Sequence, residues 1–188
     1  MSVLKKIGFF ILDTIQTIVL SLSIFIIVYL FFFQPHQVKG SSMYPNLQNG
    51  DFLLTNKISY RLHNPQRGDI IVFKAPKTEP CSEIECEYIK RLIGLPGDRV
   101  MVLGGKIYIN GQVLNESNYL AADVVTQPGT FLPEGVEKII PENYYLPIGD
   151  NRPFSRDGRE FGPIPKDSIV GKAWIRYWPL NKLGVIKD

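Results

Sequence analysis

Metal-binding and redox-active side chains are scarce in this chain of 188 residues, which has two histidines and two cysteines. Cys81 and Cys86 are accompanied by no second cysteine pair and no His-x-x-His motif, so their spacing does not predict a zinc site. The chain also has no large excess of either charge, since 21 Lys and Arg against 18 Asp and Glu give a formal net charge of +3. Such a charge is too small to attract a polyanion, so we expect no nucleic acid among the partners. No metal and no organic cofactor is implied.

Charged residues are missing altogether from Thr14 to Phe33. At 1.5 Å per residue, a helix of this length matches the roughly 30 Å core of a bilayer. A secretory signal peptide is one alternative, because Lys5 and Lys6 precede the run. The run is longer than the apolar core of a signal peptide, however, and it ends in bulky residues without a small-x-small cleavage pattern. A buried hairpin helix of a soluble protein is a second alternative, but so long an apolar run is unusual in a small domain.

We therefore predict that residues 1–33 form a short cytoplasmic N-terminus and an uncleaved transmembrane anchor. Lys5 and Lys6 should remain in the cytoplasm under the positive-inside tendency. This places residues 34–188 on the extracytoplasmic face of the cell membrane, behind a single membrane crossing.

Residues 34–188 are long enough to bury one core, and we expect a single, mainly β domain. Short segments rich in β-branched and aromatic residues, bounded by Gly and Pro, predict strands within 69–76, 98–114 and 168–180. The Asn110-Gly111 pair predicts a hairpin, because a type I′ turn needs positive φ at both central positions.

No long amphipathic helix is expected after Phe33. Residues 115–147 lack clear periodicity and contain four prolines, which indicates long loops or a small appendage. We expect this region to belong to a small insertion at about 100–147.

Three segments carry residues suited to catalysis. Ser41 and Ser42 follow a glycine and precede Met43-Tyr44-Pro45, Lys90 ends a short apolar run, and residues 149–165 are dense in charged and polar groups. Each has an ordinary interpretation taken alone: a turn, a solvated surface lysine and a solvated loop.

Together the segments resemble the type I signal peptidases, in the short form typical of Gram-positive bacteria. These are membrane-anchored serine proteases that remove signal peptides from exported proteins. The resemblance rests on four boxes that occur in the family's order, at Ser42 to Leu47, Arg67 to Phe73, Lys90 to Asp98 and Gly149 to Arg159. The chain departs from the family pattern at Asn46, Pro153, Phe154 and Gly158. The resemblance implies a β-barrel-like catalytic domain behind one transmembrane helix.

Carried over residue by residue, the resemblance makes Ser42 the nucleophile and Lys90 the general base. Ser41 is the competing serine, but Ser42 directly precedes the Met-Tyr-Pro. A lysine acts as a base near neutral pH only if burial disfavours its charged form, and the apolar neighbours of Lys90 suit that role. We interpret the two histidines, His36 and His63, as surface or interface residues.

Supporting residues also follow from the resemblance. Ser155 would accept a hydrogen bond from the Lys90 amine and orient it. An ion-paired scaffold beneath the site would comprise Asp150, Arg152, Asp157 and Arg159.

The expected substrates are signal peptides of preproteins, cut after small-x-small motifs and met at the lipid bilayer. Their small side chains would be read by shallow apolar pockets, for which the matching residues are Val38, Met43, Leu47, Val72, Tyr88 and Ile89. The alternative for these six is an ordinary core position. Cys81 and Cys86 could close a disulfide on the exported side, with two free thiols as the alternative.

Two rival functions stay open at this point. A Ser-Lys protease of the self-cleaving repressor type would share the catalytic fold but has no need of an anchor. A membrane-tethered β-domain that only binds partners would carry the serine and lysine boxes incidentally.

Overall fold

The computed structural model describes residues 3–81 and 86–187. The chain divides into two compact units, Met1–Gln34 and Pro35–Asp188.

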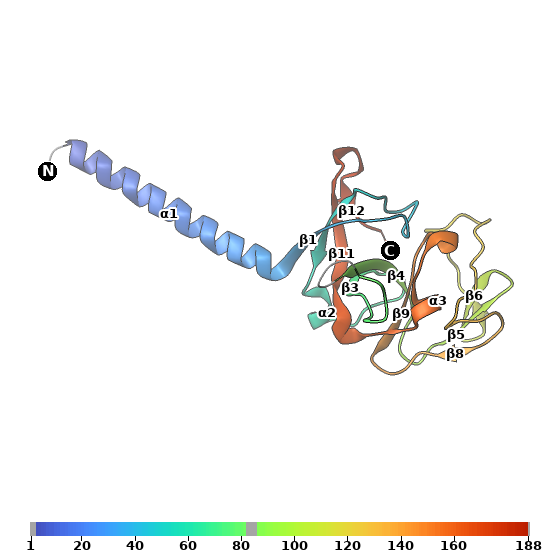
Figure 1. Cartoon of the computed structure of the whole chain (residues 1–188). Helices are drawn as coiled ribbons and strands as arrows, with labels where there is room; N and C mark the ends of the chain where they lie inside the picture. Colours follow the sequence, from blue (N-terminus) through green and yellow to red (C-terminus); the bar gives the residue numbers. More distant parts are fainter. Residues whose placement is uncertain (1–2, 82–85, 188) are drawn as a thin grey trace. The chain divides into compact units, whose positions relative to one another are not determined.

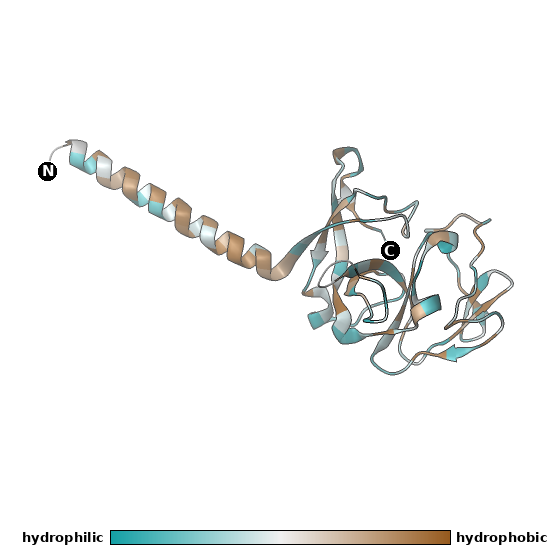
Figure 2. Ribbon diagram, viewed as in Figure 1, coloured by the Kyte–Doolittle hydropathy of each residue, from teal (hydrophilic) through white to brown (hydrophobic). Residues whose placement is uncertain are grey.

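The first unit consists mostly of one helix, α1 (Val3–Phe32). Hydrophobic residues dominate it, with hydrophilic ones near its start (Figure 2). From Lys5 to Phe32 it is long and apolar enough to cross a membrane, and none of its apolar span is buried by protein. The hydroxyls of Thr14, Thr17 and Ser23 each donate to the carbonyl four residues earlier, at 2.8 to 2.9 Å. These polar side chains are thereby satisfied within the helix, as an apolar surrounding requires.

The second unit is mainly β, which confirms the predicted fold class (Figure 1). Its large sheet has eight strands in the order β1-β2-β11-β3-β4-β9-β10, with β12 paired to β11. These strands are β1 (Phe33–Gln37), β2 (Phe52–Asn56), β3 (Ile70–Lys74), β4 (Glu87–Gly94), β9 (Tyr144–Ile148), β10 (Ile164–Pro165), β11 (Ile169–Trp178) and β12 (Gly184–Val185). The pairings from β2 through to β10 are antiparallel.

This sheet is strongly curled. Three strands separate β1 from β4 in the sheet order, so a flat sheet would hold them about 19 Å apart at ~4.8 Å per strand. Yet His36 Nε2 on β1 lies 2.6 Å from Glu87 Oε2 on β4, and His36 Nδ1 lies 2.8 Å from Thr55 Oγ1. The His36 side chain is 10% exposed, so of the two interpretations offered for it, a surface or an interface residue, the surface one does not hold. His63 is exposed.

A second sheet of four strands has the order β7-β6-β5-β8. It comprises β5 (Arg99–Leu103), β6 (Lys106–Ile109), β7 (Gln112–Val113) and β8 (Lys138–Ile139). Asn110 and Gly111 both have positive φ, 52° and 81°, as the expected type I′ turn between β6 and β7 requires. In Figure 1 this sheet lies beside β9, at one side of the domain.

Helices after α1 are short within the described part of the chain. They are the α-helices α2 (Ser59–Leu62) and α3 (Gly158–Phe161) and the 3-10 turns η1 (Arg152–Phe154), η2 (Lys166–Ser168) and η3 (Leu180–Lys182). Strand β3 is buried on both faces, because Ile70 packs into one core cluster while Ile71 and Phe73 pack into another. Strand β3 is therefore enclosed on both faces, and Lys90 to Gly94 of the neighbouring β4 are buried as well.

Candidate active site

A closed loop between β1 and β2 carries Ser42. The Val38 N–H donates to the Asp51 carbonyl at 2.8 Å, and the Gly50 N–H donates to the Val38 carbonyl at 2.9 Å. Gly40 and Gly50 have φ near +90°, a conformation that side chains disfavour. Backbone hydrogen bonds therefore close the loop, and its backbone conformation favours glycine at position 40, before the serine, and at position 50, after it.

The second central residue, Lys90, lies on β4, which pairs with β3 on one side and β9 on the other. Lys90 is 5% exposed. Its Nζ lies 2.7 Å from Ser42 Oγ and 3.2 Å from the Ile89 carbonyl oxygen. The Tyr88 ring adds a cation–π contact at 5.2 Å from Nζ to the ring centroid. The structure thus brings together the two residues that the sequence named as nucleophile and base.

Burial lowers the pKa of Lys90 from 10.5 to about 8. The carboxylates of Asp157 and Asp150 act in the opposite direction, and Arg159 adds a smaller lowering effect. Desolvation dominates because a buried ammonium loses its hydration. A substantial neutral fraction near pH 8 can accept a proton from an alcohol within hydrogen-bonding distance.

Asp150 forms a buried, bidentate ion pair with Arg91, the residue after the lysine. The two bonds measure 2.8 and 2.9 Å, and both side chains are 1% exposed. Asn46 Nδ2 donates to the same carboxylate at 2.8 Å, and the Tyr119 ring lies 4.0 Å from the Arg91 guanidinium carbon. The pair therefore links the serine loop to the lysine strand.

Asp157 forms the other scaffold carboxylate. It accepts from Arg159 Nε and Nη2, both at 2.9 Å, and from the Gly149 N–H at 2.9 Å. Arg152 Nε donates to the Gly149 carbonyl at 3.1 Å, and its other nitrogens bond to Glu116 and Thr126. All four scaffold residues that the sequence named are buried and hydrogen-bonded, and both backbone groups of Gly149 are held by them.

Gly149 permits a close approach of chain segments next to the serine. A Cβ at this position would lie 2.1 Å from Ser155 Oγ and 2.5 Å from the Ser42 carbonyl oxygen. The Ser155 hydroxyl is buried and has no hydrogen-bond partner among the residues that the structure describes. The expected hydrogen bond from Lys90 to Ser155 is therefore not formed here, because the lysine amine donates to Ser42 and to its neighbour's carbonyl instead.

The sequence of the chain matches a known protein family. The family model described as "Signal peptidase, peptidase S26" matches residues 11–178. The chain belongs to the signal peptidase S26 family. It is accordingly a peptidase, and the resemblance noted in the sequence is confirmed.

Several curated relatives share this family. Signal peptidase I of Leptolyngbya laminosa is 41% identical over 176 residues, covering 92% of this chain and 82% of the relative. Probable signal peptidase I-2 of Synechocystis sp. is 37% identical, covering 92% of this chain and 76% of the relative. Signal peptidase IB of Staphylococcus aureus (strain COL) is 37% identical and covers 92% of both chains. A crystal structure of a signal peptidase I from Enterococcus faecalis V583 matches with 31% identity and a TM-score of 0.44, covering 58% of this chain and 97% of that one.

The six residues expected to contact substrate in this peptidase fall into two groups. Four are buried to 5% exposure or less: Val38, Met43, Leu47 and Val72. Three of these pack in one core cluster, with partly buried Ile89 against it, while partly buried Tyr88 packs against a separate cluster. Tyr88 and Ile89 are thus the only partly exposed members of this set of six.

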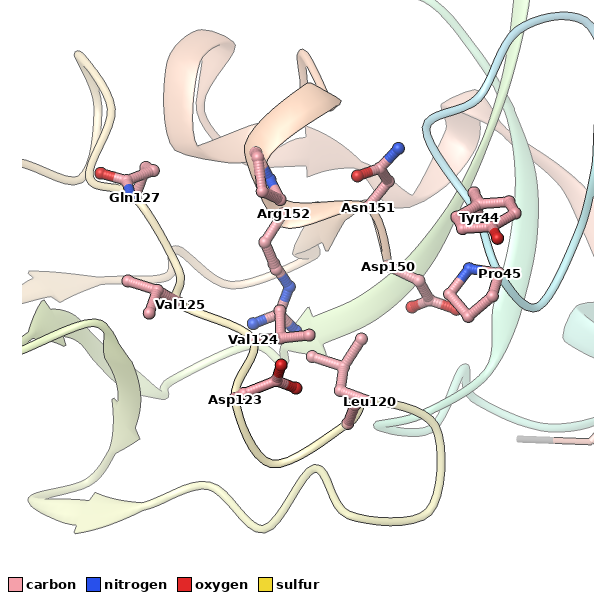
Figure 3. Close-up of a pocket in the computed structure, with 12 residues that line it drawn as sticks. Tyr44, Pro45, Leu120, Asp123, Val124, Val125, Gln127, Asp150, Asn151 and Arg152 are labelled. Atoms are coloured by element: carbon pink, nitrogen blue, oxygen red, sulfur yellow. The ribbon is translucent and has the colours of Figure 1, made fainter.

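Further residues of the site were missed by sequence reasoning. Asn151 donates from its backbone to the Ser42 carbonyl at 3.0 Å and from Nδ2 to the Ser41 carbonyl at 2.9 Å. Figure 3 shows Asn151 beside Tyr44, on the wall of a pocket. Asn151 could have been predicted, because it lies within the fourth box of the family resemblance, Gly149 to Arg159. Glu116 and Tyr119 offered no such signal, because they lie in an aperiodic stretch far from their partners in sequence.

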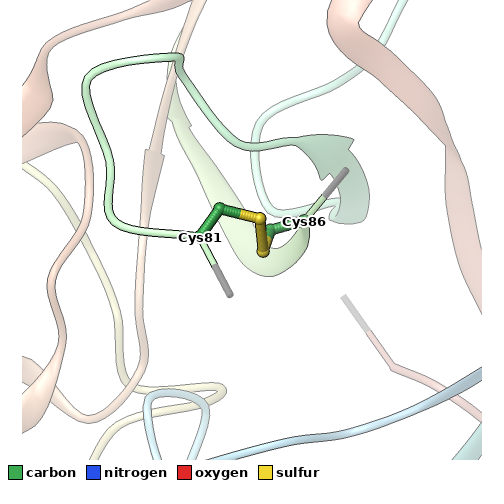
Figure 4. The surroundings of a disulfide bond; sticks show 2 residues. All are labelled: Cys81 and Cys86. Atoms are coloured by element: carbon green, nitrogen blue, oxygen red, sulfur yellow. A yellow bond between two sulfur atoms is a disulfide. The ribbon is translucent and has the colours of Figure 1, made fainter. Parts of the chain in front are cut away.

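Cys81 and Cys86 are joined by a disulfide in the structure (Figure 4). Nearby in sequence, the Glu79 side chain forms an ion pair with Arg156 at 2.6 Å. This pair ties the segment before β4 to the segment that contains Ser155. Within the described residues, no group of three or more His, Cys, Asp or Glu side chains is placed to hold a metal ion.

Proposed function

We propose that this chain is a membrane-bound serine endopeptidase that removes N-terminal signal peptides from exported proteins, with Ser42 as nucleophile and Lys90 as general base. The observation that carries the proposal is the 2.7 Å separation of Lys90 Nζ from Ser42 Oγ, at a lysine that is 5% exposed. Family membership favours this function over a module that only binds partners.

In the proposed reaction, the neutral Lys90 amine takes the hydroxyl proton of Ser42 as Oγ attacks the scissile carbonyl carbon. The resulting ammonium gives that proton to the leaving amine as the C–N bond breaks, which leaves an ester on Ser42. The amine then takes a proton from a water molecule that attacks the ester. Collapse of this second intermediate restores the serine hydroxyl and the neutral lysine.

Each tetrahedral intermediate needs a donor for its oxyanion. The backbone N–H of Ser42 suits this role, since it donates no hydrogen bond within the part of the chain that the structure describes. Ser155, whose buried hydroxyl lies beside the serine backbone, is proposed to orient the lysine amine once acylation removes the Ser42 hydroxyl as a partner.

The substrate would be cut after a small-x-small motif and would lie extended along the edge of the site. Tyr88 and Ile89 would contact its side chains directly, and the buried Val38, Met43, Leu47 and Val72 would set the shape beneath them. Small pockets of this kind reject large side chains by steric overlap.

We further propose that α1 anchors the chain in the lipid bilayer, with Lys5 and Lys6 in the cytoplasm and residues 34–188 on the extracytoplasmic face. Ser42 is nine residues beyond Phe33, so an extended link spans at most about 30 Å. Cleavage would therefore take place close to the membrane surface. The proposed reaction involves no nucleic acid and no cofactor.

The test is cleavage of a peptide containing an Ala-x-Ala site by the full chain in detergent micelles. Wild-type protein should cut after the second Ala, whereas Ser42→Ala and Lys90→Met should each lower kcat/KM by at least about a thousandfold. Methionine keeps the length of the lysine stem without the amine, so the variant should remain folded.

Ser41→Ala is the matched control, because it removes the neighbouring hydroxyl and should retain most of the activity. Near-normal turnover by folded Ser42→Ala or Lys90→Met would refute the assignment. Loss of activity in Ser41→Ala with retention in Ser42→Ala would transfer the nucleophile to the other serine.

A further inference from the structure

A pocket of about 500 Å³ adjoins the serine loop and has no part in the proposed chemistry. Tyr44, Pro45 and Asn151 contribute one wall, and Leu120, Val124 and Val125 face them from the aperiodic stretch (Figure 3). Its volume lies within the range of ordinary small-ligand sites. None of the six residues expected to contact the substrate lines it.

Three charged residues line this pocket: Asp123, which is exposed, and Asp150 and Arg152, which are buried. Asp150 is paired with Arg91, and Arg152 is paired with Glu116, so neither is available to hold an ionic ligand. Aliphatic and aromatic side chains form much of the remaining wall, and Tyr44 and Val125 are about half exposed. The pocket therefore suits an apolar side chain.

The pocket is also close to the reacting atoms. Tyr44 follows Ser42 by two residues, which places the two Cα atoms within ~7 Å. Asn151 lines the pocket and hydrogen-bonds to the backbone of both Ser41 and Ser42. An extended peptide advances about 3.3 Å per residue, so one to three residues lead from the scissile bond to the pocket.

We propose that this pocket is a subsite for the mature part of the substrate, taking one bulky apolar side chain from the first three residues after the cut. The inference rests on the proposed function, in which the signal peptide side of the substrate occupies the region of Tyr88 and Ile89. The residues after the cut then continue past Ser42 toward Tyr44 and Asn151. The subsite contributes to specificity and takes no part in bond breaking.

The subsite can be tested with the full chain in detergent micelles and three kinds of substrate. Ala-x-Ala peptides of the first kind carry leucine at one of the three positions after the cut, and the peptide of the second kind carries glycine at all three. The third is an Ala-x-Ala ester whose small alcohol leaving group has no residue after the cut. For one of the three leucine peptides, the one whose leucine reaches the pocket, we expect kcat/KM to be about tenfold higher than for the glycine peptide.

Ala121→Trp fills the pocket, since exposed Ala121 lines it, and Ala122→Trp is the matched control because exposed Ala122 does not. Ala121→Trp should abolish most of the leucine preference and leave ester hydrolysis within twofold of wild type, while Ala122→Trp should keep the preference. Because both changes are at exposed positions, both variants should remain folded.

Equal cleavage of the leucine and glycine peptides by wild-type protein would overturn the subsite. Slower ester hydrolysis in Ala121→Trp would also overturn it, because the ester has nothing to place there. If wild-type protein cuts no substrate, the proposed function itself fails, and the subsite fails with it.

Discussion

At the scale of single residues, the proposed chemistry depends on the burial of the Lys90 side chain. A lysine with its ordinary pKa of 10.5 would be almost fully protonated at neutral pH and unable to take a proton from serine. Burial on a central strand lowers this pKa to about 8, and the nearby carboxylates only partly oppose the effect.

This shift predicts the pH dependence of cleavage. Because the neutral amine is the active form, kcat/KM should rise as the pH increases through about 8 and level off above it. Initial rates on an Ala-x-Ala peptide between pH 6 and 10, with enzyme stability checked at each pH, would measure this. A profile that has levelled off by about pH 7, or that is still rising steeply at pH 10, would contradict a buried lysine with this pKa as the base.

At the scale of elements, the site is assembled where the serine loop, β4 and the segment after β9 meet. Gly149 stands at this junction, with Asp157 and Arg152 bonded to its two backbone groups. A side chain there would collide with Ser155 and with the backbone of Ser42.

Gly149→Ala should therefore displace the serine and lower kcat/KM by about a hundredfold or more, with a loss of stability on the order of 1–3 kcal/mol from overpacking. Gly184→Ala is the control, because a Cβ at Gly184 meets no atom within 4 Å and its φ is not positive. Peptide cleavage and urea denaturation would measure the two effects. Unchanged activity in Gly149→Ala would show that catalysis does not require the close approach of these segments.

Sequence reasoning succeeded for the fold where local patterns carry information. The strands within 69–76, 98–114 and 168–180 and the Asn110-Gly111 turn follow from side-chain type and turn chemistry. The serine and lysine boxes were found through the family resemblance, since a lone serine or lysine has no local signature.

Other parts of the site could not be predicted because they depend on long-range pairing. Tyr119 packs on Arg91, Glu116 pairs with Arg152, and Asn46 reaches the Asp150 carboxylate, although none of these pairs is close in sequence. The contact between His36 and Glu87 was not predicted for the same reason, because Glu87 becomes a neighbour only when the sheet curls. The Ser155 contact was expected from the family, yet the amine satisfies its hydrogen bonds elsewhere in this structure.

At the scale of the whole molecule, the two units differ in the surroundings that stabilise them. The apolar side chains of α1 are exposed to solvent along the helix, whereas the domain of residues 35–188 buries its own core. Water would strongly disfavour such an exposed apolar surface, and a bilayer would accept it.

We therefore expect the full chain to float with phosphatidylcholine vesicles in a sucrose gradient and to aggregate without detergent. A chain that begins at Pro35 should remain in the soluble fraction in both conditions. Co-flotation of the shorter chain to the same extent, or a monodisperse full chain in detergent-free buffer, would contradict an anchor formed by α1.

The origin of the lysine's weak basicity has a consequence for the conditions in which the enzyme can work. A base whose proton affinity is lowered by a neighbouring cation loses that tuning when dissolved ions screen the neighbour. Here burial of Lys90 is the main cause. The charged groups that shift its pKa to a smaller extent, Asp157, Asp150 and Arg159, are themselves buried in ion pairs, Asp157 with Arg159 and Asp150 with Arg91. Mobile ions have little to screen at such a site, so proton transfer from the serine should proceed equally well in dilute and in saline surroundings.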